Sequence, residues 1–205
     1  MFNWVYDLVV GLIDWGGYFG VYLLALLETV VPPIPSELVL PIAGMRAANG
    51  PLGLPGVILA GTLGSMTGNV LWFLLARRVS ERALKRFVDG HGRWLTMDWR
   101  DVENAQRMFD EHGGGIVFTA RLLPAVRTFI SIPAGVAHMP FARFLAWSTA
   151  GTLIFCVAFT GAGYAAGSNV ARIEEIMRPI TAFVIGGIVV WYIWRQLTWK
   201  RRHSA

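Results

Sequence analysis

The sequence is short of charged residues and almost free of cysteine. Only 15% of its 205 residues are Asp, Glu, Lys or Arg, whereas 55% are hydrophobic. That balance is too apolar for an ordinary soluble domain of this length, and it indicates a single membrane domain. The lone cysteine, Cys156, excludes an intrachain disulfide and leaves the redox compartment open.

Motifs of several functional classes are missing as well. No group of His, Cys and acidic residues has the spacing of a metal site, and no glycine-rich loop ends in the lysine that cradles phosphate. We therefore expect neither a metal nor a cofactor. The basic residues gather at 77–107 and 195–202 without any nucleic-acid-binding motif, so no nucleic-acid partner is expected and their charge is interpreted as membrane topology.

Three segments are long and apolar enough to cross a bilayer, which takes roughly 20 residues of helix. These predicted spans are residues 54–76, 141–166 and 179–197. Basic residues follow the first span and fill the tail at 198–205, which assigns both regions to the cytoplasm because cytoplasmic loops hold the excess of Lys and Arg. Counting the crossings backwards places the N-terminus outside.

Residues 1–45 contain no Lys, Arg or His. The cationic start of a signal peptide is therefore missing, and no cleavage is expected. The stretch 1–16 is predicted to form an amphipathic helix at the outer face. The stretch 79–112, which mixes charged and apolar residues, is predicted to form its cytoplasmic counterpart.

Two further apolar segments, 17–45 and 114–139, are interrupted by prolines near their middles. Proline removes a backbone donor and disfavours helix at the residue before it, so each half is too short to cross the membrane. We predict two re-entrant hairpins that enter and leave by the same side. A kinked full-length span is the alternative for 17–45. The turns are assigned to Pro32 and Pro35 in one hairpin and to Pro124 in the other.

The order of these elements repeats. An amphipathic segment, a broken hairpin and a glycine-bearing span occur twice, and a shift of 91 places takes Pro33 to Pro124 and Ala43-Gly44 to Ala134-Gly135. One crossing separates the hairpins, so the copies would have opposite orientation, as in many secondary transporters. The predicted fold is an all-α integral membrane protein with an inverted repeat of amphipathic helix, re-entrant hairpin and transmembrane helix, followed by a C-terminal transmembrane helix.

Two glutamates, Glu28 and Glu37, flank the prolines of the first hairpin. An ionised acid at the centre of a membrane helix costs about 2.5–3.5 kcal/mol on insertion scales, so it faces a cavity, pairs with a cation or takes up a proton. Burial itself favours the neutral carboxyl. The alternative is that one of the two glutamates, Glu37 rather than Glu28, is a solvated cap at the membrane surface.

Two arginines, Arg121 and Arg127, bracket Pro124 in the second hairpin. A guanidinium stays charged and offers a planar fork of donors that suits phosphate or carboxylate. Two uses are open if both hairpins reach the middle of the membrane. The charges neutralise one another and hold the hairpin tips together, or the arginines bind an anionic headgroup while the acids carry protons.

The charged hairpins match a known pattern. The sequence resembles the DedA family, also called the VTT-domain or SNARE-associated Golgi protein family, over residues 17–170. The resemblance rests on the acidic-proline run Glu28, Pro32, Pro35, Glu37, on the string FDEHGGGIVFTARLLPAVRTF at 109–129, and on Ala134-Gly135.

The resemblance implies a multi-pass protein of the bacterial inner membrane that moves lipids between leaflets. Its expected cargo is an anionic lipid, undecaprenyl phosphate, moved from the outer to the inner leaflet with protons. Arg121 and Arg127 would bind the phosphate, while Glu28 and Glu37 would couple protons or balance charge. The alternatives are an uncoupled phospholipid scramblase, a phosphatidylethanolamine translocase and a membrane assembly partner without cargo. An isoprenoid lipid phosphatase is a further one, but we expect no enzyme and no catalytic residue.

Some residues depart from the pattern or stay secondary. Asn69 and Trp72 stand where the family often has Asp and Tyr, and Asn69 is expected to make a buried interhelical contact rather than to bind substrate. His138 is a secondary site candidate, with a surface position as its alternative. Glycines at small-residue spacing predict close helix packing, either within the chain or in a homodimer; they are Gly61, Gly64, Gly68, Gly161, Gly163 and Gly167.

Overall fold

The computed structural model describes residues 3–30, 36–79, 99–123 and 126–167. Within these ranges all regular structure is helical, in agreement with the all-α prediction. The helices are α1 (Asn3–Val30), α2 (Ser36–Asn49), α3 (Leu54–Arg77), α5 (Trp99–Leu122), α6 (Ser131–Val136) and α7 (Phe141–Ala166).

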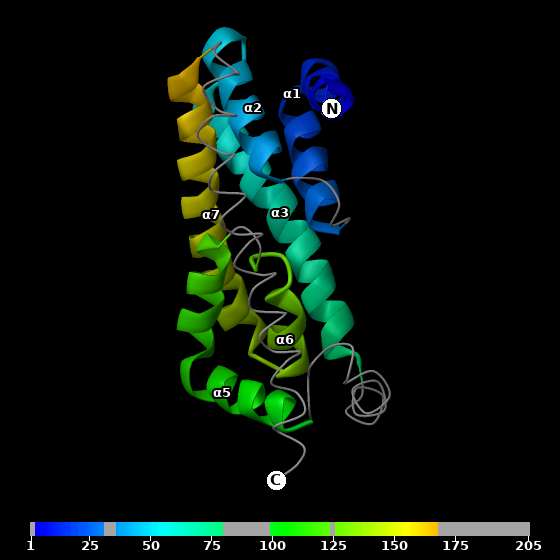
Figure 1. Cartoon of the computed structure of the whole chain (residues 1–205), viewed down its shortest axis with the longest axis vertical. Coiled ribbons are helices and arrows are strands. Elements are labelled where there is room, and N and C mark those ends of the chain that lie inside the picture. The colour runs from blue at the N-terminus through cyan, green and yellow to red at the C-terminus, as the bar shows by residue number, and fades with distance from the viewer. Residues whose placement is uncertain (1–2, 31–35, 80–98, 124–125, 168–205) are drawn as a thin grey trace, which may run out of the picture.

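Two long helices, α3 and α7, run the length of the bundle beside each other (Figure 1). They contain 24 and 26 residues, or roughly 36 and 39 Å at 1.5 Å per residue. Both are long and apolar enough to cross a membrane, and they coincide with the predicted spans 54–76 and 141–166. The predicted span 179–197, the basic tail and therefore the orientation fall outside the described residues.

By length and composition, Leu8–Val30 is a third helix that could cross a membrane, although we divided this stretch between an amphipathic segment and a hairpin. The helix is bent at Gly17, whose φ of 53° and ψ of −128° suit only glycine. The straight part after the bend measures roughly 20 Å, which is short of a hydrocarbon core of about 30 Å. The sequence division at 16/17 lies at this bend.

The chain reverses direction twice at mid-height, between α1 and α2 and between α5 and α6 (Figure 1). Helix α1 ends and α2 begins part-way along α3, and α5 likewise ends part-way along α7. Like α1, α5 is bent, at His112, so that its first part lies crosswise at one end of the bundle and its second part rises along α7. The prolines assigned to these turns, Pro32, Pro35 and Pro124, lie outside the described residues.

The helix that follows each reversal packs on the long helix of the other half. A Cβ added to Gly44 of α2 would collide with the carbonyl oxygen of Thr160 in α7. A Cβ added to Gly135 of α6 would collide with the carbonyl oxygen of Phe73 in α3. The two glycines are the pair related by the 91-residue shift, and they serve the same purpose in both halves, the close approach of two backbones.

The two largest apolar clusters lie inside the bundle, and large apolar side chains also cover its outside. Leu63 of α3 is 61% exposed and Phe19 of α1 is 59% exposed, as suits helices that face lipid. One cluster joins α1, α2 and α3 through Val9, Ile13, Val21, Leu24, Val39, Ile42, Ala43, Ala47 and Val57. The other joins α3, α5, α6 and α7 through Phe73, Phe109, Val117, Ala120, Ile130, Ala134, Met139 and Phe144.

Candidate functional site

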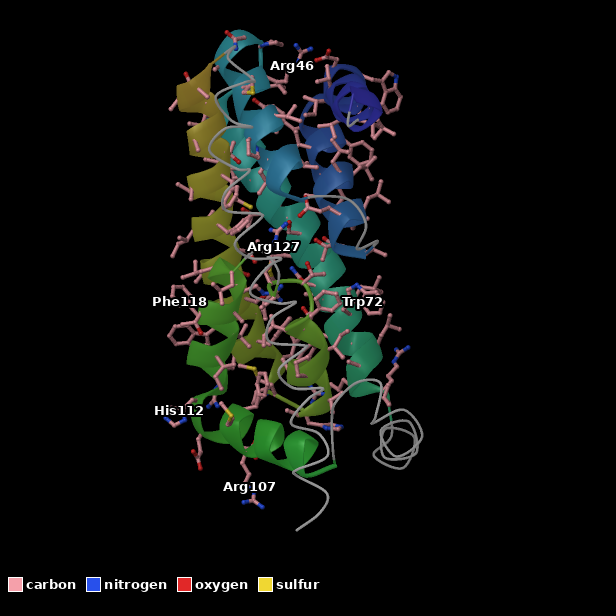
Figure 2. All side chains as sticks on the ribbon, viewed as in Figure 1. Arg46, Trp72, Arg107, His112, Phe118 and Arg127 are labelled. Atoms are coloured by element: carbon pink, nitrogen blue, oxygen red, sulfur yellow. The ribbon has the colours of Figure 1, made fainter. Side chains whose placement is uncertain are left out.

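Polar side chains are buried at mid-height, where the two chain reversals approach each other. Glu28 lies near the end of α1, Asn69 in α3, Arg121 near the end of α5, Arg127 in the following turn and Ser131 at the start of α6. All five are at most 5% exposed. Figure 2 shows Arg127 midway between Arg46 and Arg107, which mark opposite ends of the bundle.

The centre of this buried cluster is an ion pair between Glu28 and Arg127. The guanidinium of Arg127 also lies over the ring of Phe155 in α7, 4.3 Å from its centroid. Taking two charges out of water is costly, and removing one partner of such a pair costs about 3–5 kcal/mol because the other charge is left uncompensated. Two residues 99 positions apart are therefore coupled across the two reversals.

Arg121 is held differently, by neutral acceptors of its own half and by an aromatic ring. Its Nη1 donates to the carbonyl oxygen of Arg127, and its Nη2 donates to Ser131 Oγ at 2.8 Å. Ser131 in turn donates to Asn69 Oδ1 at 3.1 Å, which joins α6 to α3. The ring of Phe144 lies 5.7 Å from the guanidinium carbon. Arg121 thus positions the backbone that carries Arg127.

The cluster retains hydrogen-bonding capacity. Glu28 Oε2, Arg121 Nε and Arg127 Nε are buried and have no hydrogen-bond partner among the described residues. A buried donor without an acceptor is costly in a low-dielectric interior. The guanidinium groups of Arg127, which is paired with Glu28, and of Arg121 are chemically suited to bind a phosphate oxygen.

Other predicted site residues lie elsewhere or beyond the description. Glu37 is the second residue of α2, and its side chain, like Pro32, Pro35 and Pro124, falls outside the described part. His138 is exposed and adopts a φ of 53°, with its amide donating to the Gly135 carbonyl and the next amide to Ala134, so that it ends α6. It takes no part in the hydrogen bonds of the buried cluster.

Sequence reasoning missed several partners of the arginines. Ser131 stands in the apolar string FISIPAG, ten residues after Arg121, and no local spacing predicts the hydrogen bond between them. Gly151 makes room for Arg121, because a Cβ there would lie 2.6 Å from the Cβ of the arginine. Phe155 had no distinguishing signal among the apolar residues of α7.

Trp72 was noted only as a departure, yet it supports the first reversal. Its Nε1 donates to the carbonyl oxygen of Thr29 at 3.1 Å. Thr29 is the second-last residue of α1. The last carbonyl oxygens of a helix receive no hydrogen bond from within that helix, and leaving them exposed to lipid is costly. Trp72 therefore satisfies a carbonyl next to Glu28.

We expect Trp72→Phe to destabilise the protein by about 1 kcal/mol, because an aromatic ring is kept while the hydrogen bond to Thr29 is lost. Thermal unfolding of the purified protein in detergent measures this change. Trp15, which is 81% exposed, supplies the control, and Trp15→Phe should leave the midpoint unchanged. Equal midpoints for the two variants would contradict the role of Trp72.

Within the described ranges, no three or more His, Cys, Asp or Glu residues lie together in a way that could hold a metal ion. The VTT-domain family model matches residues 34–165. The chain is 34% identical to a Lactococcus lactis subsp. cremoris "Alkaline phosphatase-like protein" over 91% of this chain and 88% of that protein. It is 35% identical to "Undecaprenyl phosphate transporter A" of Staphylococcus aureus over 68% of each chain.

A third relative is "Protein DedA" of Escherichia coli, 26% identical over 84% of this chain and 77% of that protein. No solved structure matches the chain. The family model covers more than half of the chain and contains the whole segment from Arg121 to Ser131, and the resemblance noted in the charged hairpins is thereby confirmed. The chain is a membrane protein that belongs to the VTT-domain, or DedA, family.

Proposed function

We propose that this protein is a lipid transporter that moves a phosphate-bearing lipid, undecaprenyl phosphate, from the outer to the inner leaflet of the bacterial cytoplasmic membrane. The observation that carries the proposal is the buried ion pair between Glu28 and Arg127, which joins the two chain reversals at mid-height. The relative named undecaprenyl phosphate transporter A supports the choice of lipid.

The phosphate exchanges with Glu28 on Arg127. In the empty protein the carboxylate neutralises the guanidinium, and the Phe155 ring faces the same cation. When the phosphate takes the place of the carboxylate, Glu28 is left in a buried site and takes up a proton. Arg121 holds the backbone of residue 127 during the exchange and offers its Nε to the same anion.

Proton uptake makes the direction feasible. Moving one negative charge towards a negative interior is opposed by about 2.3 kcal/mol per 100 mV. A proton on Glu28 that travels with the phosphate cancels one of its charges. Glu37, at the start of α2, is proposed as the second proton-coupling or charge-balancing acid beside the same turn.

The arrangement in the membrane belongs to the same proposal. The reversals α1–α2 and α5–α6 would be re-entrant hairpins of opposite orientation, with the N-terminus outside and the C-terminus in the cytoplasm. The short straight part of α1 supports this arrangement, as does the crossed packing of α2 on α7 and of α6 on α3. The glycine contacts described here are within one chain, and a homodimer would use other surfaces.

Transport in proteoliposomes tests the proposal. Undecaprenyl phosphate placed in both leaflets should be depleted from the outer leaflet when the outside is acidic, and the movement should slow when the gradient is collapsed. Glu28→Gln should remove the dependence on the gradient because the amide cannot carry the proton. A wild-type protein that does not move the lipid would overturn the proposal.

The same vesicles distinguish the alternatives. Equal movement with and without a gradient would indicate a scramblase, and preference for phosphatidylethanolamine would indicate a translocase for that lipid. The name of the Lactococcus relative makes phosphate release the matching enzymatic control. Inorganic phosphate liberated from an isoprenoid pyrophosphate by the purified protein would instead support a phosphatase.

A further inference from the structure

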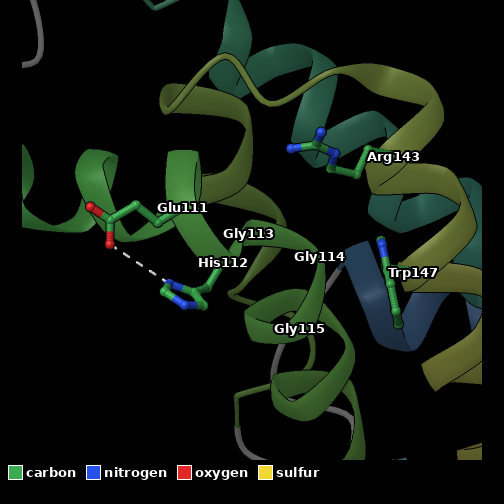
Figure 3. Close-up of a pocket in the computed structure, with 7 residues that line it drawn as sticks. All are labelled: Glu111, His112, Gly113, Gly114, Gly115, Arg143 and Trp147. Carbon is green, nitrogen blue, oxygen red and sulfur yellow. Dashed lines mark ion pairs between the residues drawn. The ribbon is translucent and has the colours of Figure 1, made fainter.

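A second polar site lies at the end of the bundle where α5 bends and α7 begins. It is a pocket of about 320 Å³ (Figure 3). None of its residues belongs to the buried cluster around Arg127. The residues that line the pocket are Glu111, His112, Gly113, Gly114, Gly115, Arg143 and Trp147.

One wall of the pocket carries two hydrogen-bond donors from the first turns of α7. Arg143 and Trp147 are four residues apart and therefore share a helix face, and Figure 3 shows the guanidinium and the indole nitrogen on the same side of the pocket. Both side chains are exposed, and neither has a hydrogen-bond or ion-pair partner among the described residues. This wall is suited to bind an anion.

Arg143 is also placed where its charge is unfavourable. It is the third residue of α7, and the amino end of a helix carries partial positive charge. A cation at that position raises the local positive potential, which a bound anion would reduce. The position of Arg143 thus favours the same ligand class as the free donors.

The opposite wall is bare backbone. Three consecutive glycines, Gly113 to Gly115, leave the bend of α5 without side chains facing the pocket. A Cβ on Gly114 would collide with Nε1 of Trp147, so this glycine lets the indole lie against the helix. A Cβ on Gly115 would meet nothing within 4 Å, and its direction is open.

The negative charge of the lining does not compensate Arg143. Glu111 lies 3.8 Å from His112 Nδ1, and both side chains are directed away from Arg143 in Figure 3. A ligand held between the glycines and α7 would therefore meet Arg143 and Trp147 and not the carboxylate. The local potential favours an anion.

The surroundings indicate an amphiphile. The bend of α5 at His112, which lines the pocket, lies at the corner where the crosswise part of α5 meets the part that rises along α7 (Figure 1), as expected for the depth of lipid headgroups. Apolar side chains continue from it on the same side of α7, with Ile154 and Val157, seven and ten residues after Trp147, each 48% exposed. The ring of Phe118 packs edge-on against Trp147 at 5.9 Å and extends the apolar surface.

We propose that this pocket binds the phosphate headgroup of an anionic membrane lipid, with Arg143 and the Trp147 indole N–H as donors and the lipid chain along the outer face of α7. The site holds the headgroup at the surface of one leaflet, separate from the ion pair at mid-height. Its existence does not depend on the transport proposed above.

Equilibrium binding to the full-length protein in detergent tests the site, with short-chain phosphatidylglycerol as the lipid probe and inorganic phosphate as the free anion. The lipid should bind saturably and at least about tenfold more tightly than inorganic phosphate, because the chain adds apolar contact. Arg143→Gln should weaken lipid binding about tenfold through the loss of a charge-assisted hydrogen bond.

Two matched variants make the test specific. Gly115→Leu should weaken binding to a similar extent by filling the pocket, and helix content should not fall because the direction is open and leucine favours helix. Arg107→Gln removes the same charge from the exposed face of α5 away from the pocket and should leave binding unchanged (Figure 2).

Wild-type affinity in folded Gly115→Leu protein would overturn the proposal, and so would an equal loss in Arg107→Gln and Arg143→Gln, which would indicate a diffuse basic surface. Equal affinities for inorganic phosphate and for the lipid would show that the pocket binds a free anion and not a lipid headgroup, which would also overturn the proposal. Lipid titration of Glu28→Gln protein separates the two sites. This variant changes only the mid-height pair and leaves the pocket residues unchanged, so the lipid should bind the pocket with wild-type affinity.

Discussion

Arg127→Ala is expected to destabilise the protein by about 3–5 kcal/mol and to abolish lipid transport. The stability loss follows from the ion pair, since Glu28 is only 4% exposed and would be left as a buried charge without its partner. The transport loss follows from the proposed mechanism, in which this guanidinium receives the phosphate. Thermal unfolding and proteoliposome transport measure the two effects.

The double variant Glu28→Gln with Arg127→Ala separates structure from function. Removing both partners of a buried pair is far less costly than removing one, so its stability should recover to within about 1–2 kcal/mol of the wild type. Transport should stay abolished, because no cation remains at that position. Wild-type transport by the double variant would show that the pair serves only to join the reversals.

Arg121 supplies the matched comparison. It is as deeply buried as Arg127, but its donors go to the Arg127 carbonyl and to Ser131. Ser131→Ala removes one of these acceptors without altering any charge. We expect it to weaken phosphate binding moderately, by about tenfold, while the dependence of transport on external pH is preserved, since Glu28 is unchanged.

The gross organisation followed from the sequence because it depends on a few large energies. An uninterrupted apolar run of 20 or more residues has few options but to cross the bilayer, which identified α3 and α7. Acids and arginines in apolar surroundings must find each other or water, which predicted that the charges of the two broken segments face one another. The observed pair is Glu28 with Arg127.

The detailed contacts could not be predicted, because they depend on the registers of packed helices. Whether Glu28 pairs with Arg121 or with Arg127 is decided by differences of a few ångströms along α1 and α5. Those differences are set in turn by glycine contacts such as Gly151 with Arg121. The Asn69–Ser131 hydrogen bond depends in the same way on how deeply α6 sits against α3.

Histidine and glycine show the limits of residue type as a guide. His138 stands near the arginines in sequence. Its positive φ, however, breaks the helical backbone just after α6, and its side chain is exposed at the surface. The glycine spacing on α7 predicted packing at three positions. Gly163 packs tightly, whereas a Cβ on Gly161 would meet nothing and Gly167, with a φ of 60°, ends the helix.

The second large effect is expected from Gly163→Ala, which should cost about 1–3 kcal/mol or more and prevent normal assembly of the bundle. A Cβ at this position would collide with the backbone carbonyl of Pro41 in α2. The same two helices also touch where Gly44 packs on the backbone of Thr160, so the collision can be relieved only by separating α2 from α7. Helix α2 carries Glu37, and α7 carries the Phe155 ring beneath Arg127, so transport should fall as well.

Gly161→Ala is the control two residues away on the same helix. Its Cβ would meet nothing within 4 Å, and the change from glycine should favour the helix by up to about 1 kcal/mol. Opposite shifts of the thermal midpoint for two chemically identical substitutions cannot arise from helix propensity, which changes alike in both. If Gly163→Ala instead unfolds at the wild-type temperature and transports lipid, α2 and α7 do not need this close contact, and the crossed packing would not be what brings the two reversals together.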